Sequence, residues 1–429
     1  MHNERTILII LIALLASTTF TTITISSAYA QQEMTPTQTF ETQNEYIKLA
    51  ISADGTHTVA IDNTTGNLAM FNETHILWNT HLPGINSMAM SENASLIAAA
   101  TTNGIYLFNP ENPTPQQHYD LSYEDPMIAL SNDGNTLAYA ATSTHQNIIT
   151  TVVYLFDSRN LIPIWSTTLP GTLQSLSTSG NGNYTTITTD QPGTLYLFSK
   201  QPLTPLWAYN FGQHSGAAKI SNDGNYIITT GGNQTGENSL RVYRFKRQSP
   251  QPNYIKIISE LPPTPRLTVS AQGSTFALGF AESNRLIYFN LDLPGYGYGP
   301  GSVLNTTLLG KPTTITTSSD GKYTAVGTDS GIYIYDYMNN ELTLTKRYTN
   351  NNPHITDIDI TPDGWHLAAA TQDNKHTTIY LFDIVDIQNG HTYFLLQIFI
   401  PAILFLAAST ALIYVLRRKR KPQKPTNTN

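Results

Sequence analysis

The residues with the most suggestive spacing for chemistry are Asp357 and Asp359, which alternate along a short apolar segment. If the segment is a strand, both carboxylates point to one face. The same spacing is as typical of a solvated pair, or of a pair that hydrogen-bonds to a turn. The two aspartates are therefore noted without a catalytic assignment.

Five further aspartates recur in Ser/Thr-x-Asp-Gly tetrapeptides, at positions 54, 133, 223, 320 and 363. Recurring carboxylates suggest a metal site or an acid/base site. A structural role is favoured, because Ser and Asp side chains bond nearby backbone N–H groups and Gly accepts the positive φ of a hairpin bulge. Only five of eight related turns carry the aspartate, and a ring of repeats is expected to keep those turns apart.

Motifs for other chemistry are missing. The chain has no cysteine, which excludes disulfides, thiolate metal sites and cysteine nucleophiles. Its 11 histidines form neither H-x-H nor H-E-x-x-H, and there is no G-x-S-x-G elbow and no P-loop. We therefore predict no catalytic residue, no cofactor and no metal ligand. Dispersed residues can still converge at a ring axis, so an enzyme remains an alternative.

Eight repeats organise the chain. Each opens with a Ser/Thr-x-x-Gly-like turn and reaches an aromatic residue about twenty positions later. The turns begin at Ser52, Ser91, Ser131, Ser179, Ser221, Ser270, Ser318 and Thr361. The aromatic positions are Phe71, Phe108, Phe156, Phe198, Phe245, Phe289, Tyr335 and Phe382. The second turn lacks its Gly, and Lys246 follows Phe245 in place of a turn-type residue. Repeats of this length, rich in strands and turns, predict an all-β, eight-bladed β-propeller with four-stranded antiparallel blades. Seven blades plus one irregular repeat is the alternative.

The last repeat shows the expected strands, named a to d outward from the axis. Strand a covers Ile355–Ile360, strand b His366–Ala370 and strand c Thr378–Phe382. Elsewhere a strand d follows, over Ile76–His81, Ile164–Leu169, Leu206–Phe211, Tyr254–Ile258, Val303–Leu308 and Leu342–Arg347, with a weak one near Gln117–Leu121. The last repeat lacks its own strand d. We expect Thr37–Asn44 to supply it and close the ring; Ile384–Ile387 is the weaker choice.

Two apolar segments predict the cellular location of the protein. Arg5, the apolar run Ile7–Ala16 and the Ala28–Ala30 site predict a signal peptide over residues 1–30, with an uncleaved anchor as the alternative. Residues 393–416 carry no charge and are long enough for one C-terminal transmembrane helix. The basic tail, residues 417–429, predicts a cytoplasmic C-terminus. Residues 31–392 then form an extracellular domain of a single-pass type I cell-membrane protein.

Charge excludes one class of partner. Residues 31–392 hold 16 Lys+Arg and 29 Asp+Glu, a net charge of −13. Nucleic-acid binding needs clustered cations, so no nucleic-acid partner is expected. Six N-x-Ser/Thr sequons fall in this exterior part and are candidate N-glycosylation sites: Asn63, Asn72, Asn93, Asn183, Asn233 and Asn305.

The strand order also predicts an orientation. The chain should leave the last blade on the face that carries the a–b and c–d turns, and the nine residues 384–392 span at most ~30 Å. That face would look toward the membrane. The face with the b–c and d–a loops would look outward, with the long b–c loops 142–150 and 231–239 on it. The long c–d loops 246–253 and 291–301 do not fit this division.

The turns and the aromatic-Asp strand ends, Phe156-Asp157, Tyr335-Asp336 and Phe382-Asp383, resemble WD-repeat proteins over about residues 47–383. No strand ends in Trp-Asp and no repeat opens with Gly-His. The resemblance implies that His354, before its strand, has a structural role. The repeats Ile-Leu-Trp78, Pro-Ile-Trp165 and Pro-Leu-Trp207 also resemble quinoprotein-like propellers. In that family the outer Trp docks one blade on the next. The chain as a whole is similar to prokaryotic, and more narrowly archaeal, surface proteins with a propeller ectodomain.

These observations lead to three hypotheses of function. The first is a membrane-anchored surface module that binds or scaffolds a protein or glycan partner without catalysis. The second is a propeller enzyme, such as a hydrolase, lactonase or dehydrogenase, with a site at the axis. The third is a subunit of a membrane assembly. Fold alone does not choose among them.

Overall fold

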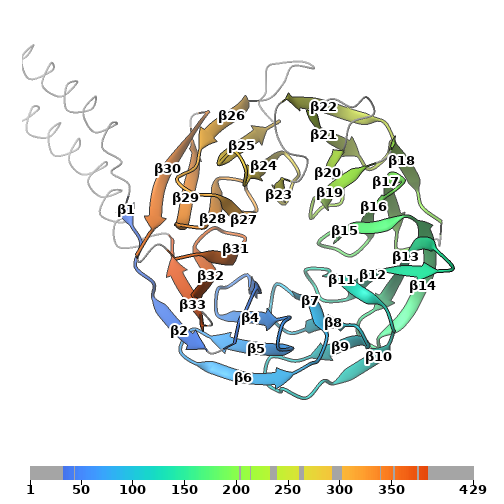
Figure 1. Ribbon diagram of the computed structural model, residues 1–429, viewed down its shortest axis with the longest axis horizontal. Helices are drawn as coiled ribbons and strands as arrows, with labels where there is room; N and C mark the ends of the chain where they lie inside the picture. The colour runs from blue at the N-terminus through green and yellow to red at the C-terminus, as the bar shows by residue number, and fades with distance from the viewer. Residues whose placement is uncertain are drawn as a thin grey trace, which may run out of the picture. The chain divides into compact units, whose positions relative to one another are not determined.

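The computed structural model describes residues 32–42, 44–201, 204–212, 214–231, 239–259, 265–291, 302–338, 340–350, 353–373 and 376–384. These residues form eight antiparallel sheets arranged as a ring around a central axis (Figure 1). The prediction of an eight-bladed propeller is confirmed, and the seven-blade alternative is wrong. The segments 1–30 and 393–416 lie outside the described residues, and the four predicted domain boundaries stay predictions. Within the described ranges no helix is long and apolar enough to cross a membrane.

Each blade has four strands in the order a to d. The innermost strands a are β3 (Lys48–Ile51), β7 (Ile85–Met90), β11 (Glu124–Leu130), β15 (Thr172–Thr178), β19 (Ser215–Ile220), β23 (Arg266–Val269), β27 (Pro312–Thr317) and β31 (Ile355–Ile360). Strands b are β4 (His57–Asp62), β8 (Ile97–Thr101), β12 (Thr136–His145), β16 (Tyr184–Asp190), β20 (Tyr226–Gly231), β24 (Thr275–Phe280), β28 (Tyr323–Thr328) and β32 (His366–Asp373). Strands c are β5 (Asn67–Asn72), β9 (Gly104–Phe108), β13 (Ile148–Asp157), β17 (Gly193–Ser199), β21 (Ser239–Lys246), β25 (Arg285–Asn290), β29 (Gly331–Met338) and β33 (His376–Asp383).

The outer strands d are β6 (Ile76–His81), β10 (Gln117–Asp120), β14 (Ile162–Pro170), β18 (Trp207–Gly212), β22 (Pro252–Ser259), β26 (Ser302–Thr307) and β30 (Glu341–Tyr348). Blade 8 takes its strand d from the other end of the chain. There β2 (Gln38–Thr42) pairs antiparallel with β33, so Phe40 lies opposite Ile379. The predicted closure by residues 37–44 is therefore confirmed.

One strand was not expected from the sequence. β1 (Gln32–Glu33) adds a fifth strand to blade 7 by pairing parallel with β30. Glu33 accepts hydrogen bonds from Arg347 Nε at 2.9 Å and from the Thr349 backbone N–H at 3.0 Å. The N-terminal segment thus joins two neighbouring blades before the first repeat begins.

The core lies between blades. Small alanines of strands b, such as Ala98 and Ala369, are fully buried, and bulky aromatics of strands c lie farther out. The tryptophans of the three Trp-containing repeats each contact an aromatic ring of the next blade. The ring centroids are 5.8 Å apart for Trp78–Phe108, 5.1 Å for Trp165–Phe198 and 5.6 Å for Trp207–Phe245. The outer tryptophans therefore dock one blade on the next, as the quinoprotein-like resemblance implied.

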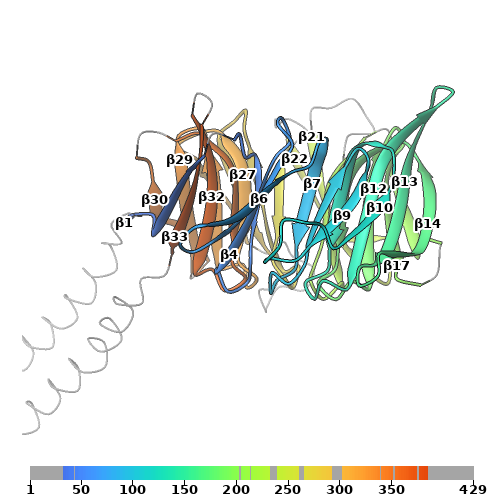
Figure 2. The ribbon, with the colours of Figure 1, turned by 90° about the horizontal axis from the view of Figure 1, so that it is seen from below.

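The two faces of the ring differ. Residues 142–150, expected to be a loop, instead continue β12 and β13 as a hairpin whose turn, Gln146-Asn147, has positive φ at both positions (50° and 64°). A two-residue turn of this kind matches the twist of its strands, so pairing extends to His145 and Ile148. Figure 2 shows this hairpin rising from the b–c/d–a face. β33 ends on the opposite, a–b/c–d face, because Asp383 pairs with His366 next to the a–b turn.

Candidate functional site

The carboxylates of the a–b turns have structural partners. Ser131 Oγ donates to Asp133 Oδ1 at 2.6 Å and accepts the Thr136 N–H at 2.9 Å, and Asp133 Oδ1 also accepts the Asn135 N–H at 3.0 Å. The turns at Ser52, Ser221, Ser318 and Thr361 repeat this pattern. Burial opposes ionisation of Asp133, but these hydrogen bonds prevail and lower its pKa. The structural interpretation of these aspartates agrees with the contacts.

The turns are not kept apart, however, and that expectation was wrong. The residue after each turn Ser donates its backbone N–H to the corresponding carbonyl of the next blade. The chain of bonds runs Ala53 to Glu92, Glu92 to Asn132, Asn132 to Gly180, Gly180 to Asn222, Asn222 to Ala271, Ala271 to Ser319 and Ser319 to Pro362. These bonds form a belt of turn-to-turn hydrogen bonds around the ring. Pro362 has no N–H, so the belt cannot continue from blade 8 to blade 1.

The inner strands make a second set of contacts between blades. Side chains two and four residues before the turn Ser accept backbone N–H groups of the next inner strand. Four residues before the turn, Ser87 Oγ accepts from Ile128 at 3.2 Å and Ser175 Oγ accepts from Ala218 at 2.9 Å. Two residues before the turn, Ser177 Oγ accepts from Ile220 at 3.4 Å. These two positions are occupied in blade 8 by Asp357 and Asp359.

Asp357 and Asp359 therefore join the last blade to the first. Asp357 Oδ2 accepts the Leu49 N–H at 3.0 Å and Asp359 Oδ2 accepts the Ile51 N–H at 3.1 Å. The other oxygen of Asp357 accepts the Thr314 hydroxyl at 2.9 Å. Neither earlier interpretation, a solvated pair or a turn-bonding pair, described this role. The sequence signal was available, since the turn positions align Asp357 with Ser87 and Ser175, and Asp359 with Ser177.

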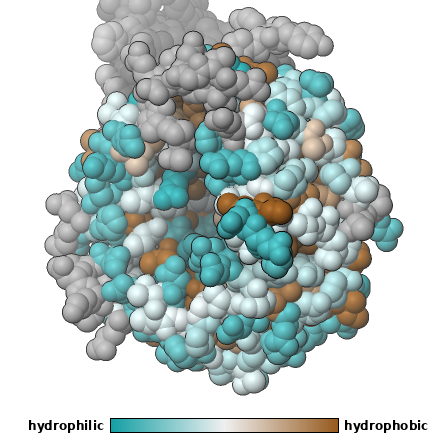
Figure 3. Space-filling view, turned by 45° about the vertical axis from the view of Figure 1, so that its right-hand side comes forward, coloured by the Kyte–Doolittle hydropathy of each residue, from teal (hydrophilic) through white to brown (hydrophobic). Residues whose placement is uncertain are grey.

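Enclosure by the ring shapes the electrostatics of this inner surface, which Figure 3 shows hollowed at the centre with hydrophilic side chains around the hollow. Burial, reinforced by the charge of Asp357, raises the pKa of Asp359 to about 7. Burial also lowers the pKa of Lys219 on β19. Its side chain is exposed to solvent, but that solvent lies inside the ring, where the blades enclose it. Lys48 donates through Nζ to the Asn86 carbonyl at 2.9 Å. The inner strands thus carry charges of both signs, with Asp357 and Asp359 half-buried and Lys48 and Lys219 exposed.

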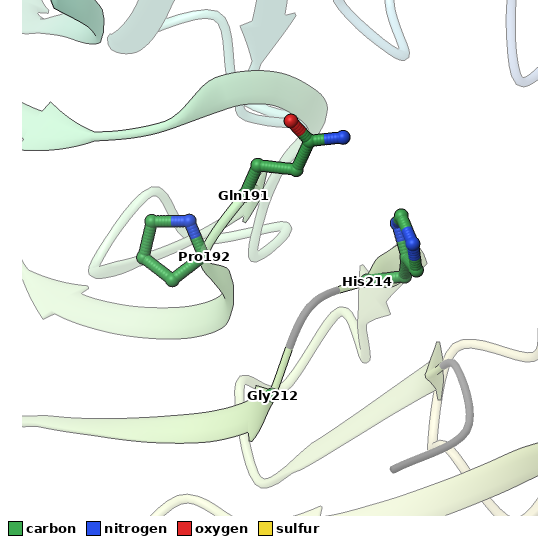
Figure 4. A pocket seen from close by; sticks show the side chains of 4 residues that line it. All are labelled: Gln191, Pro192, Gly212 and His214. Carbon is green, nitrogen blue, oxygen red and sulfur yellow. The ribbon is translucent and has the colours of Figure 1, made fainter. Parts of the chain in front are cut away.

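A pocket of about 580 Å³ opens on the b–c/d–a face and is lined by Gln191, Pro192, Gly212 and His214. Figure 4 shows the side chains of Gln191 and His214 extending toward each other. Beside it, Asp190 lies 3.1–3.2 Å from His214 Nδ1 and accepts the Ser215 N–H at 3.1 Å. A carboxylate on Nδ1 orients the ring and leaves Nε2 available. Sequence reasoning missed this pair, because Asp190 and His214 lie on different blades.

A smaller pocket of about 290 Å³ lies at the closing junction, between blades 8 and 1, with Glu73, His366 and Asp383 on its wall. His366 Nδ1 and Asp383 Oδ1 are 2.8 Å apart. His354, on the connection before β31, is exposed and its carbonyl accepts the Gln372 N–H. Among the described residues, no group of three His, Cys, Asp or Glu side chains is placed to hold a metal ion.

Five of the six sequons lie within the described ranges, and Asn233 lies outside them. Asn63 is exposed on a b–c turn, and Asn305 is exposed on β26 of the rim. The other three lie on the a–b/c–d face: Asn72, at the end of β5, is half-buried, whereas Asn93 and Asn183, in a–b turns, are exposed. Their modification stays a prediction.

Comparison with known proteins supports the fold. No family model matches the chain, and no curated protein matches it. Among solved structures, the β-propeller domain of Cps50 (Swd1) from Myceliophteria thermophila aligns with a TM-score of 0.51 at 12% identity, over 70% of this chain and 96% of that one. A chain of a mitotic checkpoint complex aligns with a TM-score of 0.52 at 14% identity, over 71% and 91%. At these identities the likeness shows the fold alone, a β-propeller.

Proposed function

We propose that this eight-bladed propeller is a cell-surface module, anchored to the membrane through residues 393–416, that binds a protein partner on its b–c/d–a face. The WD40-type fold is typical of protein-interaction scaffolds, which supports the class of function. A glycan partner is the other possibility raised by the sequence, and the experiment below separates the two.

The observation that carries the proposal is the hairpin of β12 and β13. Directly after its turn, β13 begins with Ile148, 64% exposed, and Ile149, 46% exposed, beyond the last residue at which β14 pairs with the sheet. Two adjacent isoleucines in solvent at the tip of a projecting hairpin give an apolar contact for a complementary protein surface.

The pocket beside His214 supports the same face. It lies between blades 4 and 5, while the hairpin belongs to blade 3, so both features lie on one side of the ring. Gln191 and His214 offer hydrogen-bonding groups on the same face as the exposed isoleucines. An apolar anchor with polar groups at its border is the usual composition of a protein interface.

The test is a pull-down from detergent-solubilised membranes of the native host with the tagged full chain. The variant Ile148→Gln with Ile149→Gln removes the apolar side chains at the tip without creating an N-x-Ser/Thr sequon. The matched control, Ile255→Gln with Ile257→Gln, changes two similarly exposed isoleucines on the rim strand β22. We expect a stoichiometric protein retained by wild type and control and lost from the tip variant. Retention by all three proteins, or release by free oligosaccharide, would contradict the proposal.

One observation favours the enzymatic alternative, the Asp190–His214 pair at the edge of an open pocket. An oriented imidazole is the general base that hydrolases use. A hydrolytic activity that His214→Ala abolishes without loss of fold would establish that alternative. Loss of partner binding in His214→Ala, with no activity in wild type, would support the binding module.

A further inference from the structure

The a–b/c–d face carries half of the exposed large apolar side chains in the described part of the chain. The described part of the chain has ten large hydrophobic residues that are more than 40% exposed. Five of them lie on this face: Ile76, Ile162 and Leu206 at or just before the start of outer strands, Met338 at the end of β29, and Trp365 in the last a–b turn.

These five side chains are spread around the ring rather than gathered at one point. They belong to blades 1, 3, 4, 7 and 8, and therefore surround the axis. The hairpin tip on the opposite face is different, since Ile148 and Ile149 are neighbours in sequence. A compact protein would contact one sector of the face. A flat surface contacts all sectors at once.

The flat surface that we infer is a lipid bilayer, because the apolar segment of the proposed anchor follows closely after the last blade. Ile384 lies on the a–b/c–d face, where its backbone N–H donates to the Trp365 carbonyl at 2.7 Å. Only eight residues, 385–392, separate it from the apolar segment 393–416. Eight extended residues span at most ~28 Å. A bilayer holding that segment must therefore lie close to this face.

The chain leaves the ring at blade 8, so contacts at the opposite blade are needed to keep the ring from tilting. Blade 4, with Leu206, is the fourth blade from blade 8 in either direction around a ring of eight, so it lies opposite Trp365. A tether at blade 8 alone leaves the ring free to tilt. Apolar contacts at Ile162 and Leu206 fix the opposite edge.

We propose that the a–b/c–d face is a lipid-docking surface and that the propeller lies flat on the outer leaflet. Trp365, next to the exit, takes the interfacial position that Trp prefers in membranes, and Ile162 and Leu206 contact the headgroup boundary from the opposite edge. The b–c/d–a face, with its hairpin and pocket, is thereby held outward. This inference rests on the membrane anchor of the proposed function.

The absence of cysteine from the sequence makes a direct test simple. Single cysteines replace Ile162, Leu206 or Trp365, and each full-length variant carries one fluorophore. Two controls, Ile148→Cys and Leu309→Cys, place the label on the opposite face at similar exposure. A reference label at Asn389→Cys reports the tether. The proteins are reconstituted in phosphatidylcholine nanodiscs with a nitroxide on the lipid headgroup.

We expect quenching at positions 162, 206 and 365 to be several-fold stronger than at 148 and 309. Quenching at 389 with none at 162 and 206 would overturn the docking surface and leave the anchor in place. No quenching at 389 would overturn both. Glycopeptide mapping of the native protein gives an independent readout, because docking requires Asn93 and Asn183 to be unmodified. A glycan at either position would hold the face away from lipid and contradict the proposal.

Discussion

The Asp359 carboxylate of the last inner strand accepts the backbone N–H of Ile51 in the first inner strand at 3.1 Å. This contact crosses the one junction where the belt of turn-to-turn hydrogen bonds is interrupted, because Pro362 has no N–H to donate. At this junction, Asp357 occupies the position that Ser87 and Ser175 fill in blades 2 and 4, and Asp359 occupies the position that Ser177 fills in blade 4. The ends of the ring are thus joined by carboxyl groups as hydrogen-bond acceptors.

The first prediction concerns pH. The pKa of Asp359 is about 7 in the folded chain, above the ordinary value of 3.8, because burial penalises its charge. Between about pH 4 and pH 7 the folded chain then binds more protons at this site than the unfolded chain, so stability falls as pH rises through that window. Urea unfolding of wild type and Asp359→Asn across this range measures the effect.

In Asp359→Asn, the amide oxygen still accepts the Ile51 N–H without a buried charge. The contribution of this site to the fall in stability should therefore disappear, leaving a flatter profile than in wild type. Equal slopes for the two proteins would show that Asp359 titrates in its ordinary range.

The second prediction concerns closure of the ring by the N-terminal strand. Phe40 of β2 is 9% exposed and contacts Phe71 of blade 1 with ring centroids 5.4 Å apart. Phe40→Ala should lower the free energy of unfolding by about 3 kcal/mol, since it removes a large buried side chain. Chemical denaturation measures the loss, with the exposed Ile162→Ala as a control expected to change stability little. A neutral Phe40→Ala would mean that β2 is dispensable.

The third prediction separates two docking tryptophans. Trp207 Nε1 donates to the Arg247 carbonyl of the next blade at 2.6 Å, whereas the buried Trp165 Nε1 has no hydrogen-bond partner among the described residues. Both rings lie tilted against a Phe of the next blade, and replacement by Phe shortens both contacts in the same way. Trp207→Phe should therefore cost about 1 kcal/mol more than Trp165→Phe, the typical net value of one hydrogen bond. Thermal and urea unfolding of the pair tests this difference.

The fourth prediction concerns the turn serines. Ser131 Oγ makes two hydrogen bonds, to Asp133 and to the buried Thr136 N–H. Ser270 occupies the equivalent place in blade 6 and accepts only the Thr275 N–H, at 3.2 Å. Ser131→Ala should lower the free energy of unfolding by about 1–2 kcal/mol and Ser270→Ala by less. Identical losses would indicate that the bond to Asp133 adds nothing.

The sequence alone determined the repeats, and with them the blade count and most strand positions. The strand a predicted at residues 355–360 and the strand d predicted at residues 76–81 match β31 and β6 in full. This succeeded because each turn is local: Ser, Asp and Gly within a few residues close a hairpin without help from distant chain. The missing strand of blade 8 could also be assigned to residues 37–44, because an open edge requires a partner.

Contacts between blades were decided by the tertiary structure. Asp190 and His214 meet across blades 4 and 5, and Asp357 and Leu49 meet although about three hundred positions separate them in the chain. The register between neighbouring inner strands depends on how whole blades pack, and no local pattern encodes it. The same is true of the apolar side chains on the a–b/c–d face. Ile76, Ile162 and Trp365 are unrelated in sequence and share a surface only because the ring brings every a–b and c–d turn to one side.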